Sequence, residues 1–201
     1  MSGIRAILFD LGRVLIGLDG PPIKDHWLSE TVDEAETWLR WSQSAAVKAF
    51  ESGQLSVDEF AQEILKEQGF CISPDQFIQE FERWPTTFFE GATALLEQLR
   101  QGYTLAYYSN ISELHLSRLL KVCDLNDYFD FPFASYKIGF HKPDLQGYEY
   151  VVASIGIPAA EILFIDDSLK NVEAARQVGL QAEQAIGFEA VTQVLKNRGC
   201  I

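Results

Sequence analysis

Basic residues and cysteines are scarce in this sequence. Its 201 residues include 16 Lys and Arg against 29 Asp and Glu, which gives a formal net charge of −13. No cluster of Lys or Arg occurs along the chain, so we expect no nucleic-acid partner and no membrane partner. Cys71, Cys123 and Cys200 are widely separated, without the spacing of a metal or redox motif. They predict free thiols in a reducing cytoplasm.

Long hydrophobic runs are also missing. No segment approaches the ~18 consecutive apolar residues of a transmembrane helix, and the N-terminal MSGIRAILFD lacks the pattern of a signal peptide. The hydrophobic content of 47% with 22% charged residues is ordinary for a globular chain. The sequence therefore predicts a cytoplasmic protein with a sizeable core.

Short apolar runs that end in polar residues alternate with helical stretches. The runs are IRAILFD (4–10), YTLAYYSN (103–110), FPFAS (131–135) and EILFIDD (161–167). Several helical stretches stop at a glycine, as at Gly102, Gly156 and Gly179, which is a common helix end. This alternation predicts an α/β fold with a Rossmann-like, doubly wound parallel sheet.

Residues 17–85 interrupt the alternation and show no convincing strand. They hold 14 acidic and 5 basic residues. Capping-box spacings at Thr31, Ser56 and Ser73 predict helices over 32–50, 57–68 and 74–83, with a shorter helix near 22–29. We expect a helical cap at 17–85 inserted into a catalytic core formed by 1–16 and 86–201. All four tryptophans fall in this insert: Trp27, Trp38, Trp41 and Trp84. They are more typical of a bundle core than of a wall facing a substrate.

Polar residues stand where the predicted strands end. Ligands of an open parallel sheet bind beyond the carboxyl ends of its strands. Three strands bring Asp10, the pair Ser109–Asn110 and the pair Asp166–Asp167 to that edge, and Lys142 lies in the loop GFHKPD. Carboxylates can attack phosphorus, and Mg²⁺ would reduce the repulsion between an anionic nucleophile and a phosphate. The pattern predicts phosphoryl transfer through an aspartyl-phosphate.

The sequence resembles the haloacid-dehalogenase-like hydrolases, specifically phosphatase-type members with a helical cap after the first motif. Four motifs occur in the family's order: FDLGRVL, YYSN, HKPD and FIDDSLKN, the last with Asn171 four residues after Asp167. The resemblance implies that Asp10 is the nucleophile, that Ser109 holds a phosphate oxygen and that Lys142 stabilises charge. It also implies a Mg²⁺ site made by Asp10, the Gly12 carbonyl, Asp166 and Asp167.

This resemblance predicts a Mg²⁺-dependent phosphatase of a small phosphorylated metabolite, acting as a monomer or homodimer. We expect Ser109, Asn110, Arg13 and Lys142 to bind the substrate. Two other functions stay open. A 2-haloacid dehalogenase would use Asp10 without metal, although that branch usually has an aromatic residue at position 12. A catalytically inactive member would bind a phosphorylated ligand or a protein partner.

Gly12 departs from the family pattern. Most phosphatases of the family have an aspartate there, which protonates the leaving oxygen and activates water. General acid–base catalysis typically contributes about 10²–10⁴ in rate. Gly12 therefore favours substrates with a good leaving group, such as acyl phosphates, aryl phosphates and sugar 1-phosphates. Asp19 in GLDG is a candidate replacement acid.

Overall fold

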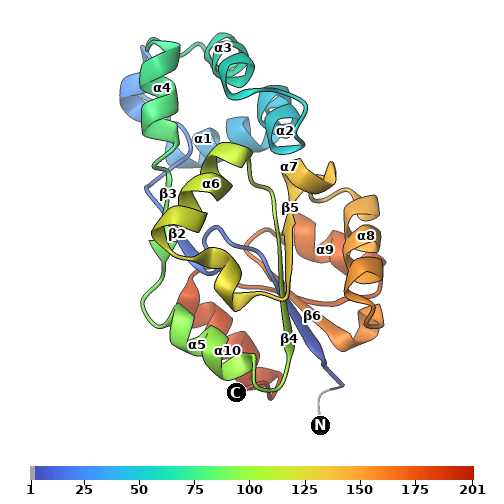
Figure 1. The fold of residues 1–201 in the computed structure, drawn as a ribbon. Coiled ribbons are helices and arrows are strands. Elements are labelled where there is room, and N and C mark those ends of the chain that lie inside the picture. The colour runs from blue at the N-terminus through green and yellow to red at the C-terminus, as the bar shows by residue number, and fades with distance from the viewer. Residues whose placement is uncertain (1–2) are drawn as a thin grey trace.

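A five-stranded parallel sheet forms the centre of the computed structural model, which describes residues 3–201 (Figure 1). The strand order is β5–β4–β1–β6–β7, and all neighbouring pairs are parallel. The strands are β1 (Ala6–Phe9), β4 (Thr104–Ser109), β5 (Phe131–Ala134), β6 (Ile162–Asp166) and β7 (Gln181–Gln184). The predicted Rossmann-like α/β fold is confirmed. Residues 1–2 of the predicted core lie outside the described residues.

The two faces of the sheet bury two separate hydrophobic clusters. In β1, Ile7 and Phe9 belong to one cluster, whereas Ala6 and Leu8 belong to the other. The first face is covered by α5 (Ala92–Leu99), α6 (Glu113–Val122) and α10 (Phe188–Asn197), and the second by α8 (Leu145–Ile155) and α9 (Leu169–Gln177). Because both faces are covered, the inner strands are continuously apolar rather than alternating.

A separate helical unit lies above the carboxyl ends of the strands, at the top of Figure 1. It consists of α1 (Glu34–Gln43), α2 (Ala45–Glu51), α3 (Val57–Gln68) and α4 (Pro74–Phe81). Its own hydrophobic cluster contains Trp27, Trp41 and Trp84, and Trp38 packs against the edge of that cluster. Stacked rings such as Phe50 and Phe60, with centroids 4.2 Å apart, fill this cluster. The unit therefore has a core of its own, distinct from the two clusters at the sheet.

Short elements complete the chain. They are α7 (Ser135–Ile138) and the 3₁₀ helices η1 (Asp25–Trp27), η2 (Leu125–Tyr128) and η3 (Ala159–Glu161). Within residues 3–201, every helix is too short or too polar to cross a bilayer.

Some of the predicted helix boundaries agree with the structure and others do not. The helix over 57–68 is confirmed, and its capping box at Ser56 is complete. The single helix predicted over 32–50 was wrong, because the chain breaks at Ser44, whose hydroxyl accepts a hydrogen bond from the Val47 amide at 3.1 Å. The first helix also begins after Asp33 rather than Thr31.

Two short strands at the boundaries of residues 17–85 were missed. β2 (Ile16–Leu18) pairs antiparallel with β3 (Pro85–Phe88), and together they connect the helical unit to the core (Figure 1). Strands of three or four residues are too short to display an apolar periodicity. The same limit explains why β7, with the sequence QAEQ, was not predicted.

Candidate active site

Asp10 follows β1 directly, at the point where the strand order of the sheet reverses. The chain adds β4 and β5 on one side of β1, then β6 and β7 on the other. Such switch points form the ligand crevice of open α/β sheets. The Asp10 amide donates to the Ile165 carbonyl of β6 at 2.8 Å, and the Asp10 residue is only 7% exposed. The nucleophile candidate is therefore fixed by the central strands.

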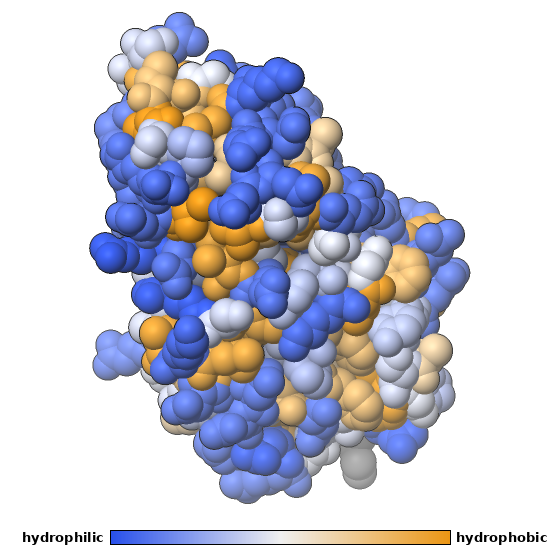
Figure 2. All heavy atoms as spheres, turned by 45° about the horizontal axis from the view of Figure 1, so that its top comes forward, coloured by the Kyte–Doolittle hydropathy of each residue, from blue (hydrophilic) through white to orange (hydrophobic). Residues whose placement is uncertain are grey.

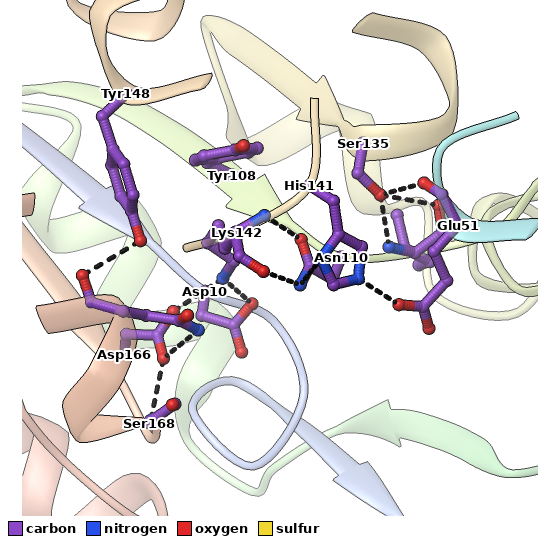
Figure 3. Close-up of polar contacts among 12 residues, drawn as sticks. Asp10, Glu51, Tyr108, Asn110, Ser135, His141, Lys142, Tyr148, Asp166 and Ser168 are labelled. Carbon is purple, nitrogen blue, oxygen red and sulfur yellow. Dashed lines mark hydrogen bonds and ion pairs between the residues drawn. The ribbon is translucent and has the colours of Figure 1, made fainter. Parts of the chain in front are cut away.

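Lys142 lies between two carboxylates (Figure 3). Its Nζ donates to Asp10 Oδ1 at 2.7 Å and to Asp166 Oδ2 at 2.6 Å, and the residue is 2% exposed. Burial acts to lower the pKa of Lys142, but the charges of Asp10 and Asp166 outweigh it and raise that pKa above its ordinary value. Lys142 is therefore a permanently charged ammonium in contact with the nucleophile candidate.

The carboxylates at this site outnumber the cations. Burial raises the pKa of Asp10 to about 7, Lys142 opposes that rise, and Asp166 and Asp167 add to it. Burial and Asp166 likewise raise the pKa of Asp167, against the opposing charge of Arg13. Three acidic side chains face one lysine and one arginine. A further cation at this edge would therefore be stabilised electrostatically.

Asp166 and Asp167 have different surroundings. Asp166 is fully buried, and its oxygens accept from Lys142, from the Ser168 amide at 2.8 Å and from Asn171 Nδ2 at 2.9 Å. Asp167 is partly exposed and binds Arg13 Nη1 through Oδ2 at 3.0 Å. Both oxygens of Asp166 thus accept hydrogen bonds from other residues. Within residues 3–201, the side chain of Asp167 is bound by another residue only at Oδ2.

The residues at this site fit Mg²⁺ when a backbone carbonyl is counted among the ligands. Among residues 3–201, no three His, Cys, Asp or Glu side chains are arranged as a metal site. Asp10 and Asp167 offer two carboxylates, and Gly12, two residues after Asp10, offers a backbone carbonyl. Two carboxylates, a carbonyl and waters are a usual ligand set for Mg²⁺. The surplus negative charge gives this set an electrostatic reason to bind a divalent cation.

Gly12 and Arg13 follow the nucleophile candidate. A Cβ at Gly12 would contact only the Leu18 side chain, at 3.7 Å, so neither space nor backbone conformation requires glycine there. Arg13 adopts a left-handed conformation, with φ of 60°, which is unusual for a residue with a side chain. Its guanidinium lies 4.9 Å from the centroid of the Trp38 ring while it binds Asp167. Arg13 therefore joins the site to α1 of the helical unit.

Ser109 and Asn110 end β4 beside this site. Ser109 is buried at the carboxyl end of the strand, where a phosphate oxygen would approach. Asn110 was predicted to bind substrate, but its side chain holds the backbone of Lys142. Its Oδ1 accepts from the Lys142 amide at 2.8 Å, and its Nδ2 donates to the Lys142 carbonyl at 3.0 Å. Asn110 therefore positions the lysine loop.

A polar chain continues from Asn110 to the helical unit (Figure 3). Asn110 Nδ2 lies 3.2 Å from His141 Nδ1, and His141 Nε2 lies 3.0 Å from Glu51 Oε2 of α2. Because the Asn110 amide donates a hydrogen bond to Nδ1, the hydrogen of the His141 ring lies on Nε2. Nε2 then donates a hydrogen bond to Glu51. The Ser135 hydroxyl donates to the Glu51 carbonyl at 2.5 Å. Sequence reasoning missed this chain, since only the position of His141 next to Lys142 hints at it.

Asp19, the candidate replacement acid, lies away from these contacts. Its side chain is 74% exposed and lies 3.6 Å from Lys24 Nζ. Within residues 3–201, Asp19 makes no hydrogen bond or ion pair with Asp10 or Lys142. The structure thus assembles Asp10, Lys142, Asp166, Asp167 and Arg13 in one polar cluster, with Asp19 outside it.

One known protein family matches most of the chain, including the residues of this site. Residues 4–179 match the family model described as haloacid dehalogenase-like hydrolase. The chain belongs to the haloacid dehalogenase-like hydrolase family.

Two full-length relatives have names that specify a phosphatase. The chain is 32% identical over 183 residues to sesquiterpene phosphatase astK of Aspergillus oryzae, covering 88% of this chain and 87% of that protein. It is 26% identical over 195 residues to D-ribitol-5-phosphate phosphatase of Bacteroides thetaiotaomicron, covering 90% and 91%. It is also 31% identical to drimenol cyclase drtB of Aspergillus calidoustus, but there it spans only 33% of the longer protein.

Solved structures share the whole fold. The HAD family enzyme bt-2542 of Bacteroides thetaiotaomicron superposes with a TM-score of 0.79 at 25% identity, covering 96% of this chain and 98% of that one. A structure of the same enzyme in complex with magnesium and inorganic phosphate superposes with a TM-score of 0.74 at 24% identity, covering 90% and 93%. The arrangement of the sheet and the helical unit is therefore shared with a solved member of the family.

Proposed function

We propose that the protein is a Mg²⁺-dependent phosphatase that hydrolyses a small phosphorylated metabolite through an aspartyl-phosphate on Asp10. The observation that carries this proposal is Lys142 held between Asp10 and Asp166 at the switch point of the sheet. A buried lysine in contact with a carboxylate favours the ionised form of that carboxylate and offsets the negative charge of an incoming phosphate.

The proposed reaction has two steps. First, a carboxylate oxygen of Asp10 attacks phosphorus, and the bond between phosphorus and the leaving oxygen breaks. Ser109 and Lys142 hold the phosphoryl oxygens. Water then attacks the phosphorus of the aspartyl-phosphate, which releases inorganic phosphate and restores the Asp10 carboxylate. Because Gly12 supplies no acid, the leaving group departs as an anion or takes its proton from water.

Asp10, Asp167 and the Gly12 carbonyl would hold the metal. Asp166 would position Lys142 by accepting a hydrogen bond from its Nζ. Bound Mg²⁺ would neutralise phosphoryl charge in the transition state. The Bacteroides thetaiotaomicron enzyme of the same fold was crystallised with magnesium and inorganic phosphate, which is consistent with Mg²⁺ as the proposed cofactor. We further propose that residues 17–85 act as a cap that limits the access of water to the site.

The proposed function does not specify the chemical nature of the leaving group. The relatives are named for a sesquiterpene and for a sugar-alcohol phosphate, which differ strongly in polarity. Asp19 stays the candidate for the missing acid. An Asp19→Asn variant with the turnover and pH profile of the wild type would remove it from that role.

The test is hydrolysis of a panel of phosphate esters, with and without Mg²⁺, by the wild type and by Asp10→Asn. The panel runs from acetyl and aryl phosphates through sugar 1-phosphates to alkyl phosphates. We expect Mg²⁺-dependent turnover that is greatest for good leaving groups and is abolished by Asp10→Asn. Absence of turnover on the whole panel by a folded protein that binds Mg²⁺ would contradict the proposal.

A further inference from the structure

A cavity of about 290 Å³ opens beside Arg13, between the loop after β1 and helix α1. From its position and lining we infer that it receives the organic group of the substrate, and that this group is hydrophobic. The substrate class would be a phosphate monoester of an apolar alcohol. This inference rests on the proposed phosphatase function and narrows it.

The cavity adjoins the proposed site through Arg13 and Leu18. Its lining includes Arg13, which binds the site carboxylate Asp167, and Leu18. The Leu18 side chain lies 3.7 Å from the position of a Cβ on Gly12. Position 12 is where most phosphatases of the family carry the acid that protonates the leaving oxygen. An organic group attached to that oxygen would therefore extend past Gly12 into the cavity.

The side chains that line the cavity are mostly apolar. Leu18, Trp38, Phe89 and Ile186 contribute to its walls. Ile186 is 53% exposed although it is a large aliphatic residue, and a substrate would remove part of that surface from water. Figure 2 shows hydrophobic residues gathered where the upper part of the molecule meets the lower part, within a mostly hydrophilic surface.

Four polar groups of residues that line the cavity each have a protein partner. Arg13 binds Asp167, and Glu34 Oε1 accepts from Trp38 Nε1 at 3.3 Å. The Gly17 carbonyl accepts from Thr86 Oγ1, and the Gly20 carbonyl accepts from Trp84 Nε1, both at 3.0 Å. A polyol would lose hydrogen bonds to water here without full replacement, which is unfavourable. A hydrocarbon group has no such loss.

The volume also suits a modest organic group. About 290 Å³ is just below the roughly 300–1,000 Å³ range of small-molecule pockets. A larger hollow of about 600 Å³ lies near Arg5, Thr104 and Asp130. Those residues stand at the amino-terminal edge of the sheet, opposite to Asp10, so that hollow is not connected with the proposed chemistry.

The test compares hexyl phosphate with ribitol 5-phosphate. Both are primary alkyl phosphates of similar length, so the reactivity of the leaving oxygen is nearly matched. We expect kcat/KM of the full-length protein with Mg²⁺ to be at least roughly tenfold higher for hexyl phosphate, because each buried methylene contributes several-fold in affinity. Equal values, or a preference for ribitol 5-phosphate, would overturn the inference.

Variants at the cavity test the same point. Ile186→Ser and Trp38→Ala should lower the ratio of kcat/KM for hexyl phosphate to that for acetyl phosphate by roughly fivefold to tenfold. Leu39→Ala is the matched control, because Leu39 is an exposed neighbour on α1 that does not line the cavity. Trp38 packs near Trp84, with ring centroids 5.9 Å apart, so the exposed Ile186 gives the cleaner variant. A ratio unchanged by Ile186→Ser would contradict the inference.

Binding separates this inference from the proposed function. Calorimetric titration of Asp10→Asn with hexyl phosphate and with ribitol 5-phosphate needs no turnover. Tighter binding of hexyl phosphate without hydrolysis of acetyl phosphate by the wild type would support the cavity and reject the phosphatase. Hydrolysis of acetyl phosphate with equal binding of the two esters would do the reverse.

Discussion

If the proposed function is right, Gly12 determines which leaving groups the site accepts. A Cβ at Gly12 meets only the Leu18 side chain, at 3.7 Å, so a larger residue fits. We predict that Gly12→Asp raises kcat for hexyl phosphate by roughly 10- to 100-fold, because it supplies general acid–base catalysis. Turnover of acetyl phosphate should gain less, since its leaving oxygen needs no proton and only the attack of water on the aspartyl-phosphate would be assisted. Steady-state kinetics on both substrates check this.

Gly12→Asn is the control for this gain. It fills the same space without an acid, so it should not raise kcat for hexyl phosphate. Equal gains in the two variants would mean that the side chain acts by packing. No gain from Gly12→Asp in a folded protein would mean that another group already supplies the proton.

His115 should make stability depend on pH. It is buried on α6, and its Nε2 donates to the Phe81 carbonyl of α4 at 2.8 Å. Burial lowers the pKa of His115 to about 4, while the hydrogen bond to Phe81 opposes that shift. The unfolded chain takes up this proton below pH ~6.5 and the folded chain only near pH 4. The contribution of neutral His115 is therefore complete above pH ~6.5 and is lost as the pH falls toward 4.

The measurement is the free energy of unfolding by urea at pH 7.5 and pH 5. Between these values the wild type should lose about 2 kcal/mol more than His115→Gln, which has no titrating ring. His26→Gln is the control, since the His26 side chain is 59% exposed. Equal losses in the wild type and His115→Gln would contradict the low pKa of His115.

The site residues that could be predicted are those whose placement follows from local pattern. Asp10, Ser109 and Asp166 each end an apolar run, and parallel strands bring their carboxyl ends to one edge. The contact between His141 and Glu51 could not be predicted, because the two residues are 90 positions apart. The bonds of Asn110 to Lys142 could not be predicted for the same reason, and its role in binding substrate stays a prediction.

At the scale of elements, α2 and α7 meet through a glycine. Gly53 follows α2 with φ of +74°, and a Cβ there would lie 2.5 Å from the Tyr136 carbonyl oxygen of α7. Gly53→Ala would therefore push the two helices apart and strain the backbone. We predict a loss of about 2–4 kcal/mol in the free energy of unfolding, combining left-handed strain with the clash. Urea denaturation measures this loss.

Gly69→Ala is the matched control for Gly53→Ala. Gly69 ends α3 with φ of +71°, but nothing lies within 4 Å of its added Cβ. It should therefore show the strain alone, about 1–2 kcal/mol. If both variants lost the same stability, the contact between α2 and α7 would not hold the helical unit on the core.

Element boundaries explain where sequence reasoning failed at this scale. The amphipathic period continues from α1 into α2, so the break at Ser44 could not be read from apolar spacing alone. The break becomes evident only through the hydrogen bond from the Val47 amide to the Ser44 hydroxyl. The β2–β3 ribbon was missed because its pairing joins residues about 70 positions apart along the chain, as in the contact of Thr86 with Gly17.

For the whole molecule, we predict that Mg²⁺ binding at the proposed site raises the melting temperature of the protein. The net charge is −13, and three carboxylates crowd the site against Lys142 and Arg13. At a Mg²⁺ concentration 100 times its Kd, binding to the folded state adds about 2.7 kcal/mol. For a chain of this length that corresponds to a rise in Tm of roughly 5–10 °C. Thermal unfolding in MgCl₂ and in NaCl of equal ionic strength measures the difference.

Two acidic variants decide whether this rise comes from the site. Asp167→Asn removes a proposed ligand, so we expect it to abolish the rise in Tm that is specific to Mg²⁺. Asp19→Asn removes an exposed carboxylate that pairs with Lys24, so it should keep the rise of the wild type. Both variants lower the net negative charge by one, so screening of the acidic surface affects them equally. A rise in Tm that persists in Asp167→Asn would mean that Mg²⁺ stabilises the molecule through its general surface charge, and the proposed ligand set would then be wrong.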